Sequence, residues 1–405
     1  MVTVALQPVM ARAHAALERG HGAEAVEQLA PALRSTALTR DDELALRITL
    51  AEAWFLQDDV DQAGAVLGRP PDTLRETIAP SILAHLWRLH GRVAQARGEQ
   101  SRAIALHQRA LRQAEAAHDA RAIGLSHFEL ARCYKQIGET ATMREHFAEA
   151  ASALHAVGDR RSLALVHSLS GSALAQAGRY DEALTALRQA ERFAAAVQAD
   201  DVLAIVYGNQ ANVAMMRHRY EQALALAEQS VARHEQFPPG YGLAVALATL
   251  GQICIHLGTL SRAQDVLRRA LEIRRGLLFH ETTGAIHDSL AQIHLIRGDY
   301  DEAEASLERA RDAYGAYEAH TPRWYDWSLR LLAARVALRR GLTALAIERA
   351  DEVVNAPGAP PADSLHAHLI AIDALLEGGR MADAERRVAV VESRIDARST
   401  PGAWG

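Results

Sequence analysis

Residues 168–190 read SLSGSALAQAGRYDEALTALRQA, and residues 289–310 read SLAQIHLIRGDYDEAEASLERA. The two stretches align without a gap on a frame of one small residue, one glycine and two alanines. Residues 89–110 and 249–270 carry the same frame. Its turn residues follow one another at a step of 40: Gly98, Gly138, Gly178, His218, Gly258 and Gly298. A step that is kept this regularly indicates an internal repeat, and the repeat decides the fold.

Each column of the frame has a physical reason. The turn glycine suits the left-handed end of a helix, where a side chain costs energy, and histidine at 218 is the one departure. Five residues after each turn, and seven before it, the residue is small in nearly every repeat, as at Ala183 and Gly171. Small residues let two helices cross closely. Larger apolar residues such as Leu187 recur at helical spacing after the turn. The repeating unit is therefore predicted to be a hairpin of two helices.

These residues resemble the tetratricopeptide repeat (TPR) family. The resemblance is carried by Leu130-Ala131-x2-Tyr134, and by Gly178-Arg-Tyr180-x2-Ala183-x3-Leu187-x2-Ala190 and its counterpart at Gly298-Asp-Tyr300. Two features depart from the family pattern, because the period is 40 residues instead of 34 and the closing proline is generally absent. Longer helices account for both departures. This long form is similar to the arrays found in sensory domains of bacterial regulators.

The predicted fold is all-α, a right-handed superhelical solenoid of about ten antiparallel helix hairpins. We expect one solenoid over residues 1–398, most regular in 83–310, with weaker repeats in 1–82 and 311–398. Residues 399–405 are expected to be a tail or the start of a truncated further repeat, so the chain is interpreted as a fragment of a longer protein.

Composition narrows the class of function. The 405 residues include 44 basic and 50 acidic side chains, a net charge of −6 that gives no general attraction to nucleic acid or to anionic membranes. The start of the chain lacks the features of a signal peptide, and the protein is expected to be cytoplasmic. The single lysine, Lys135, lies between Tyr134 and Gln136, which excludes a Walker A phosphate loop.

The concave wall of such a solenoid is lined by the first helix of each hairpin and is where a ligand is expected. The resemblance implies that groove-facing residues lie ten, six and three positions before each turn. The row six before the turn is polar throughout. With its polar neighbours it gives the predicted partner-binding residues: Arg88, Arg92, Arg132, Lys135, Ser172, Asn209, Asn212, Gln252 and Gln292. Arginines pair with carboxylates, and amides bond to a peptide backbone. The alternative interpretation is that solvation alone selects polar residues there.

No residue pattern predicts catalysis, a cofactor or a metal site. The 19 histidines do not form the His-x3-His spacing of a helical zinc site, and His127, His167 and His287 recur where the family places a packing residue. Cys133 and Cys254 lie among apolar neighbours, which favours inert burial. The protein is therefore expected not to be an enzyme.

Two interpretations of function remain. The first is a non-catalytic scaffold that binds a protein or peptide segment, with an acidic one favoured, through its concave groove. The second is a sensory or regulatory module of a larger bacterial transcription regulator or signalling protein, with a small-molecule effector as a further partner. Neither interpretation includes direct binding of nucleic acid or membrane by this chain.

Overall fold

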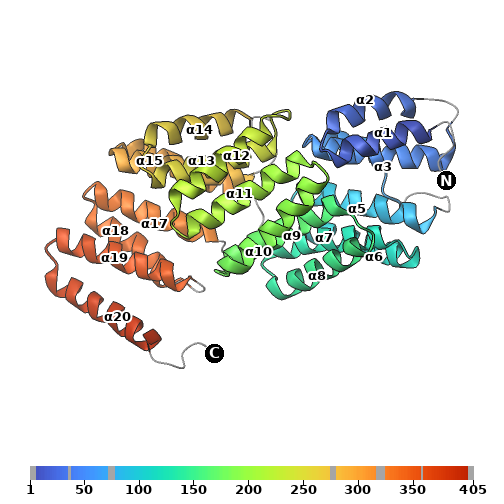
Figure 1. Cartoon of the computed structure of the whole chain (residues 1–405). Helices are drawn as coiled ribbons and strands as arrows, with labels where there is room; N and C mark the ends of the chain where they lie inside the picture. The colour runs from blue at the N-terminus through green and yellow to red at the C-terminus, as the bar shows by residue number, and fades with distance from the viewer. Residues whose placement is uncertain are drawn as a thin grey trace. The chain divides into compact units, whose positions relative to one another are not determined.

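The computed structural model describes residues 6–34, 38–71, 78–273, 280–315, 324–356 and 359–399. These residues form twenty helices and no strand (Figure 1). The first-numbered half comprises α1 (Gln7–Glu18), α2 (Gly22–Leu33), α3 (Arg40–Leu56), α4 (Val60–Leu67), α5 (Pro80–Ala96), α6 (Gln100–Ala116), α7 (Ala120–Ile137), α8 (Thr140–Ala156), α9 (Arg160–Gln176) and α10 (Tyr180–Ala196). The remaining helices are α11 (Asp200–Met216), α12 (Tyr220–His234), α13 (Tyr241–His256), α14 (Leu260–Ile273), α15 (His280–Arg297), α16 (Tyr300–Gly315), α17 (Trp324–Arg339), α18 (Thr343–Val354), α19 (Pro361–Glu377) and α20 (Met381–Ser399).

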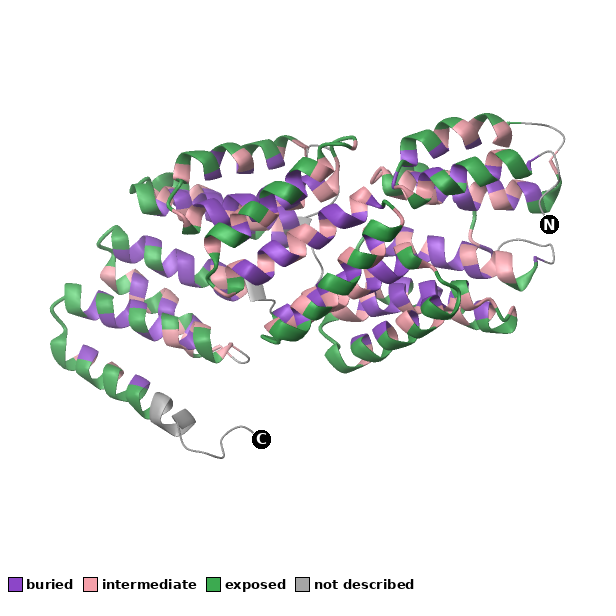
Figure 2. Cartoon of the chain, viewed as in Figure 1, coloured by how far each residue is buried: buried purple, intermediate pink, exposed green. Residues whose placement is uncertain are grey.

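Consecutive helices pack in pairs, most extensively α5 with α6, α7 with α8, α9 with α10, α11 with α12 and α15 with α16. This arrangement of helix pairs is that of a TPR-like solenoid, and it confirms the predicted all-α fold of about ten hairpins. The first and second helices of a pair differ in burial, because the first helix contacts neighbours on more sides. Figure 2 shows the resulting stripes of buried residues along the helices.

The hairpin turns adopt the conformation that the repeat predicts. Gly98, Gly138, Gly178, Gly258 and Gly298 all have φ between 74° and 85°, and His218 has φ 57°. A second series lies between hairpins, at His118, Gly158 and Gln198, with φ between 51° and 69°. The step of 40 also holds in this second series, although only one of its members is a glycine.

The small residues before each turn do let the helices cross closely. A Cβ on Gly171 of α9 would lie 2.8 Å from Cγ of Leu187 and 3.1 Å from the carbonyl oxygen of Ala183, both on α10. A Cβ on Gly124 of α7 would lie 2.6 Å from Cγ of Leu154 on α8. A methyl group at Gly171 or Gly124 would therefore force the facing leucine to shift.

The chain divides into two compact units. The first contains residues 1–257 and 272–279, and the second contains 258–271 and 280–405. Each unit has its own apolar clusters, such as Phe128, Phe147 and Leu163 in the first unit and Trp327, Leu331 and Ile370 in the second. The expectation of one solenoid over residues 1–398 stays a prediction, and residues 400–405 of the expected tail lie outside the described residues. In the described ranges, no helix combines the length and the apolar character needed to span a bilayer.

The first unit is held together by contacts between segments far apart in the sequence. Arg161 at the start of α9 donates to the carbonyl oxygen of Glu18, at 3.0 Å, and forms an ion pair with Asp201 at the start of α11. The backbone N–H of Tyr241 donates to the Asp58 carboxylate at 2.6 Å. The turns of the first two hairpins therefore contact the start of α9, α11 and α13, so the unit is compact instead of an open row of hairpins.

Candidate functional site

The first helices of successive hairpins form one layer in the first unit. Contacts join α3 to α5, α5 to α7, α7 to α9, α9 to α11 and α11 to α13. Side chains that point out of this layer, away from the second helices, can line a continuous surface. We call this surface the inner wall.

The row six residues before each turn lies on the first helices of this layer. In the first unit it consists of Arg92, Arg132, Ser172, Asn212 and Gln252, and every member is polar and half-buried. We call these five residues the polar row. Gln292 occupies the same repeat position in the second unit and is also half-buried.

The two flanking positions differ in burial. Ten residues before the turn, Arg88, Phe128, Ser168 and Ala248 are buried, and Gly208 is half-buried. Three residues before it, Gln95 and Ala175 are buried, whereas Lys135, Met215 and Ile255 keep partial exposure. Of the three rows expected from the sequence, the row ten before the turn is therefore the one that is largely buried, and the row three before it is buried in two of its five members.

Two carboxylates lie among the predicted basic residues. Glu129 on α7 is buried and lies 2.7 Å from Arg132 Nη1 and 3.5 Å from Arg92 Nε. Arg88, only 4% exposed, is paired with Glu52 of α3. Arg88 is thus held inside the wall, while the side chains of Arg92 and Arg132 remain 25% and 36% exposed.

The pKa values reflect this pairing. Burial alone would raise the pKa of Glu129, but Arg132, Arg92, His107 and Arg88 together lower it to about 2. Burial lowers the pKa of Arg92 to about 10 although Glu129 opposes the shift, and its guanidinium also lies 4.0 Å from the ring centroid of Phe55. Glu129 and Arg92 are therefore both charged at neutral pH.

With Lys135, this end of the inner wall carries four cations beside the carboxylates of Glu52 and Glu129. The sequence reasoning did not find Glu52 or Glu129. The sequence does contain a signal for Glu129, which lies nine residues before its turn. It is the only acidic residue among the repeats compared at that position, where the others have Leu89, Leu169, Asn209, Thr249 and Ser289.

Polar side chains also connect neighbouring first helices. Lys135 Nζ lies 3.2 Å from Ser172 Oγ, and Asn209 Nδ2 donates to Ser168 Oγ at 2.9 Å. Both pairs join side chains from adjacent repeats. Among the predicted site residues, Lys135 with Ser172, and Arg92 with Arg132 around Glu129, are therefore brought together.

The second unit has its own polar group. Gln292 Nε2 donates to Asp288 Oδ1 at 3.3 Å, and Ser328 Oγ of α17 donates to Asp288 Oδ2 at 3.0 Å. Burial raises the pKa of Asp288, which these two hydrogen bonds oppose. Gln292 therefore hydrogen-bonds to a buried carboxyl group, and its own side chain is half-buried.

Both cysteines, and the histidines His127 and His167, lie in packed surroundings. Cys133 and Cys254 are fully buried, and burial raises the pKa of the Cys133 thiol to about 12, where it is not nucleophilic. His127 lies 2.8 Å from His146 through their Nδ1 atoms, and His167 stacks on Phe193. Within the described ranges, no three histidine, cysteine or acidic side chains are grouped so that they could hold a metal ion.

The buried ring of His107, on α6, is expected to make the free energy of unfolding depend on pH. Its ring packs directly on Gly91 and is fully buried, which lowers its pKa to about 4 from an ordinary 6.5. The unfolded chain therefore binds a proton near pH 6.5 that the folded chain does not bind until about pH 4. The stability that the neutral His107 ring contributes is therefore complete above pH 6.5. As the pH falls from 6.5 toward 4, the free energy of unfolding decreases by roughly 3 kcal/mol.

We expect His107→Leu to remove this part of the pH dependence, because leucine fills the equivalent position at Leu187 and Leu267 without titrating. Urea denaturation at several pH values between 4 and 7 measures the effect. The stability difference between variant and wild type should widen as the pH falls. Parallel curves would show that His107 does not titrate as described.

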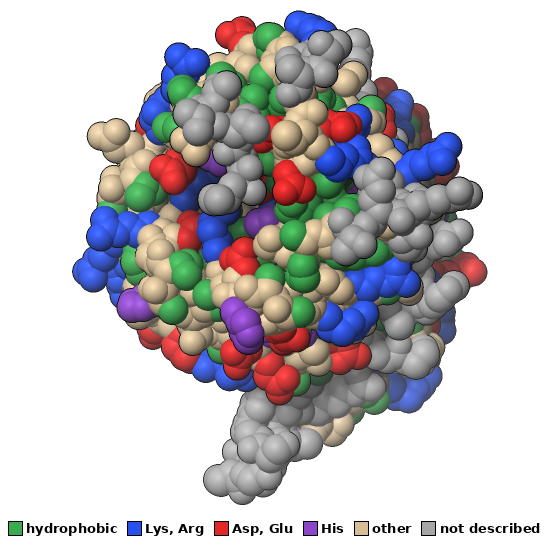
Figure 3. Space-filling view, turned by 90° about the vertical axis from the view of Figure 1, so that its right-hand side faces the viewer, with side chains coloured by type: hydrophobic (Ala, Val, Ile, Leu, Met, Phe, Trp, Pro, Cys, Tyr) green, Lys and Arg blue, Asp and Glu red, His purple; other side chains and the backbone are tan. Residues whose placement is uncertain are grey.

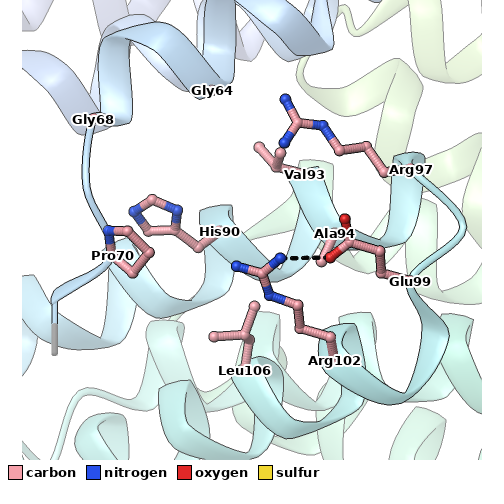
Figure 4. A pocket seen from close by; sticks show the side chains of 10 residues that line it. All are labelled: Gly64, Gly68, Pro70, His90, Val93, Ala94, Arg97, Glu99, Arg102 and Leu106. Carbon is pink, nitrogen blue, oxygen red and sulfur yellow. Dashed lines mark hydrogen bonds and ion pairs between the residues drawn. The ribbon is translucent and has the colours of Figure 1, made fainter. Parts of the chain in front are cut away.

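A separate cavity of about 170 Å³ lies between α4, α5 and α6 (Figure 4). Its lining includes Gly64, His90, Arg97 and Arg102. Arg102 is paired with Glu99 at 2.6 Å, and Arg97 lies 3.7 Å from Asp61. Since both arginines face carboxylates, the cavity has no excess charge that would define a ligand. Elsewhere, basic and acidic side chains are interspersed on the face that Figure 3 shows.

Comparison with family models identifies two stretches, residues 202–276 and residues 289–363, each matching a model described as tetratricopeptide repeat. No curated protein sequence is significantly similar to the chain.

Similar solved structures share the fold at low sequence identity. A Rap protein complexed with competence and sporulation factor is 13% identical with a TM-score of 0.57, and the match covers 95% of this chain and 99% of that one. NprR in complex with its cognate peptide NprX is 15% identical with a TM-score of 0.53, over 86% and 98% of the two chains. A signal transduction ATPase with a tetratricopeptide repeat sensor, from Pyrococcus horikoshii, is 12% identical with a TM-score of 0.53, over 93% of this chain and 52% of that one.

Proposed function

We propose that this chain, a member of the tetratricopeptide repeat superfamily, is a non-catalytic scaffold that binds an extended protein or peptide segment along the inner wall of its first unit. The observation that carries the proposal is the polar row. All five members are polar and stay partly exposed at one repeat position, whereas the row ten before the turn is buried in four of its five members. A row of this kind offers a ligand one line of polar contacts at regular spacing.

The chemistry of the row favours a peptide with an acidic end. Asn212 and Gln252 carry amides that can both donate to and accept from a peptide backbone. At the other end of the row, Arg92 and Arg132 keep partly exposed guanidinium groups beside Lys135, and guanidinium groups pair well with a carboxylate on a ligand. The amide of Asn209 and the hydroxyl of Ser172 belong to the same proposed set of binding residues. Gln292 is proposed as a binding residue of the second unit, by itself. Arg88 contributes its charge from inside the wall.

A second candidate function is a sensory or regulatory module of a larger bacterial signalling protein or transcription regulator. It is supported by the similar solved structures, because one contains a tetratricopeptide repeat sensor and another is NprR with its cognate peptide. A small-molecule effector is compatible with this role. The two candidates share the inner wall as the binding surface and differ in what binding controls.

The proposal is tested with peptides selected by the full chain from a random peptide display library, then synthesised and titrated by fluorescence anisotropy. We expect the double variant Asn212→Ala/Gln252→Ala to weaken binding by about 1–3 kcal/mol for each lost contact. The matched control is Gln189→Ala/Gln229→Ala, which removes two exposed amides from the second helices α10 and α12. Equal affinities for the two double variants would refute binding at the polar row.

A further inference from the structure

The turn of the first hairpin packs against a helix far along the chain. A Cβ on Gly20 would lie 2.5 Å from Cγ of Asp201, at the start of α11. At the regular turn glycines from Gly98 to Gly298, a Cβ would have no heavy atom within 4 Å. The close approach at Gly20 is therefore a property of this one turn and not of the repeat.

The turn of the second hairpin carries an aspartate where most turns carry glycine. Asp58 has φ 58°, in the left-handed region that glycine adopts more readily. Its carboxylate accepts a hydrogen bond of 2.6 Å from the backbone N–H of Tyr241, the first residue of α13. The preceding Gly240 has no side chain to cap this helix, and a Cβ there would lie 2.5 Å from Asp58 Oδ2. Asp58 thus gives the start of α13 an acceptor and a negative charge, both of which stabilise a helix N-terminus.

Two further contacts join the same segments. Arg161, at the start of α9, donates to the carbonyl oxygen of Glu18 at 3.0 Å and to Asp201 Oδ1 at 2.8 Å. It therefore connects the first hairpin to both α9 and α11. The rings of His21 and Phe237 lie with their centroids 5.6 Å apart, and Phe237 shortly precedes α13. We use the name clasp for the contacts among Gly20, Asp58, Arg161, Asp201 and Tyr241.

The clasp differs in chemistry from the packing that holds the first two hairpins to their neighbours. Clusters of buried apolar side chains join α1, α2 and α3 to one another, and join α3 and α4 to α5. The clasp instead consists of hydrogen bonds, an ion pair and one close backbone approach. Because apolar burial supplies most of the free energy that holds packed helices together, the clasp is the weaker of the two connections. It can open while the apolar clusters stay intact.

The helices that meet the clasp also carry part of the polar row. Ser172 lies on α9, Asn212 on α11 and Gln252 on α13. The clasp ties the starts of these three helices to the first two hairpins, so it restricts how far they can move relative to one another. Opening of the clasp therefore changes the spacing of the polar row.

We propose that the clasp is a conformational switch within the first unit. In the open state the first two hairpins leave the starts of α9, α11 and α13 and move away as a folded body. The closed and open states present the polar row at different spacings, and a ligand that binds one spacing better shifts the balance between them. The effect on a ligand rests on the proposed function, whereas the opening itself does not.

Opening is measured on the full chain by double electron–electron resonance between spin labels at Glu27→Cys on α2 and Glu221→Cys on α12. Both positions are exposed, whereas the native cysteines Cys133 and Cys254 are fully buried. We expect the labelled chain to show mainly one distance, that of the closed state. The double variant Asp58→Gly/Arg161→Ala should shift most of the population to distances longer by about 10 Å, the width of one helix. Glycine at position 58 suits the left-handed turn, so the substitution does not strain its own hairpin.

The matched control is Asp181→Ala/Arg217→Ala, which removes another aspartate–arginine pair of the first unit, 3.0 Å apart and outside the clasp. It should leave the distance unchanged. No ligand is present in this measurement, so its outcome is separate from that of the peptide titration.

A second variant tests the clasp by a different physical effect. Gly20→Ala places a methyl group on the Asp201 carboxylate and should also produce the longer distance. Its control is Gly178→Ala, which has the same left-handed strain, since φ is 84° at Gly20 and 76° at Gly178, but meets no atom within 4 Å.

The helical circular dichroism signal should stay the same in all of these variants, because the hairpins move without unfolding. An unchanged distance in both Asp58→Gly/Arg161→Ala and Gly20→Ala would overturn the proposal. A longer distance that appears only together with a loss of helical signal would overturn it as well, and so would a labelled chain that already shows mainly the longer distance.

Discussion

Replacing Glu129 with alanine is expected to lower the free energy of unfolding by about 3 kcal/mol. The Glu129 side chain is only 5% exposed and lies between Arg92 and Arg132, so its removal leaves two guanidinium groups without their shared carboxylate. The expected loss is at the lower end of the range for a broken buried ion pair. The reason is that both arginines are partly exposed and can regain water, while Arg88 keeps Glu52 as its partner.

Urea denaturation followed by circular dichroism measures this loss. Glu149→Ala on α8 is the matched control, because Glu149 is exposed and its removal should change stability by less than about 0.5 kcal/mol. The folded pKa of Glu129 is about 2, below its ordinary 4.5, so its stabilisation is complete above pH 4.5 and disappears as the pH falls toward 2. Equal stability of Glu129→Ala and wild type at pH 7 would contradict the role assigned to this carboxylate.

Replacing Leu187 with alanine is expected to cost about 2–5 kcal/mol of stability. Leu187 is fully buried, packs against the backbone of Gly171 across the α9–α10 crossing, and contacts Val213 of α11. Truncation therefore opens a cavity where three helices meet. The neighbouring backbone is held by the close crossing and cannot move in to fill it.

The control for this prediction is Leu342→Ala, the same substitution at a side chain that is 46% exposed, where the expected change is within about 0.5 kcal/mol. Thermal and urea unfolding of both variants give the comparison. Similar melting temperatures for the two variants would mean that the hairpin register is misassigned.

Several features of the fold were predictable because they depend on local chemistry. The left-handed turns at Gly98 through Gly298, including the one at His218, follow from single residues at a fixed step. The close helix crossings follow from small residues such as Gly171. The second series of left-handed turns was not predicted, because His118 and Gln198 carry no glycine to mark them.

The candidate site was less predictable. The polar identity of the row from Arg92 to Gln252 is visible in the sequence, but its partial exposure, and the burial of Arg88 beside it, depend on how closely the neighbouring first helices pack. Glu52 comes from an earlier repeat than Arg88, and the two meet only because α3 packs against α5. The position of a residue within the repeat predicts which face of its own helix it occupies. It does not predict whether a neighbouring helix buries that face.

The sequence by itself determined that this protein is a stack of helix hairpins, because turn glycines and small crossing residues act within one hairpin and repeat with it. Tertiary structure alone decided which polar side chains stay partly exposed and which charges neutralise one another. Those properties belong to the contact between one hairpin and the next, where burial and charge pairing are set by side chains about forty residues apart.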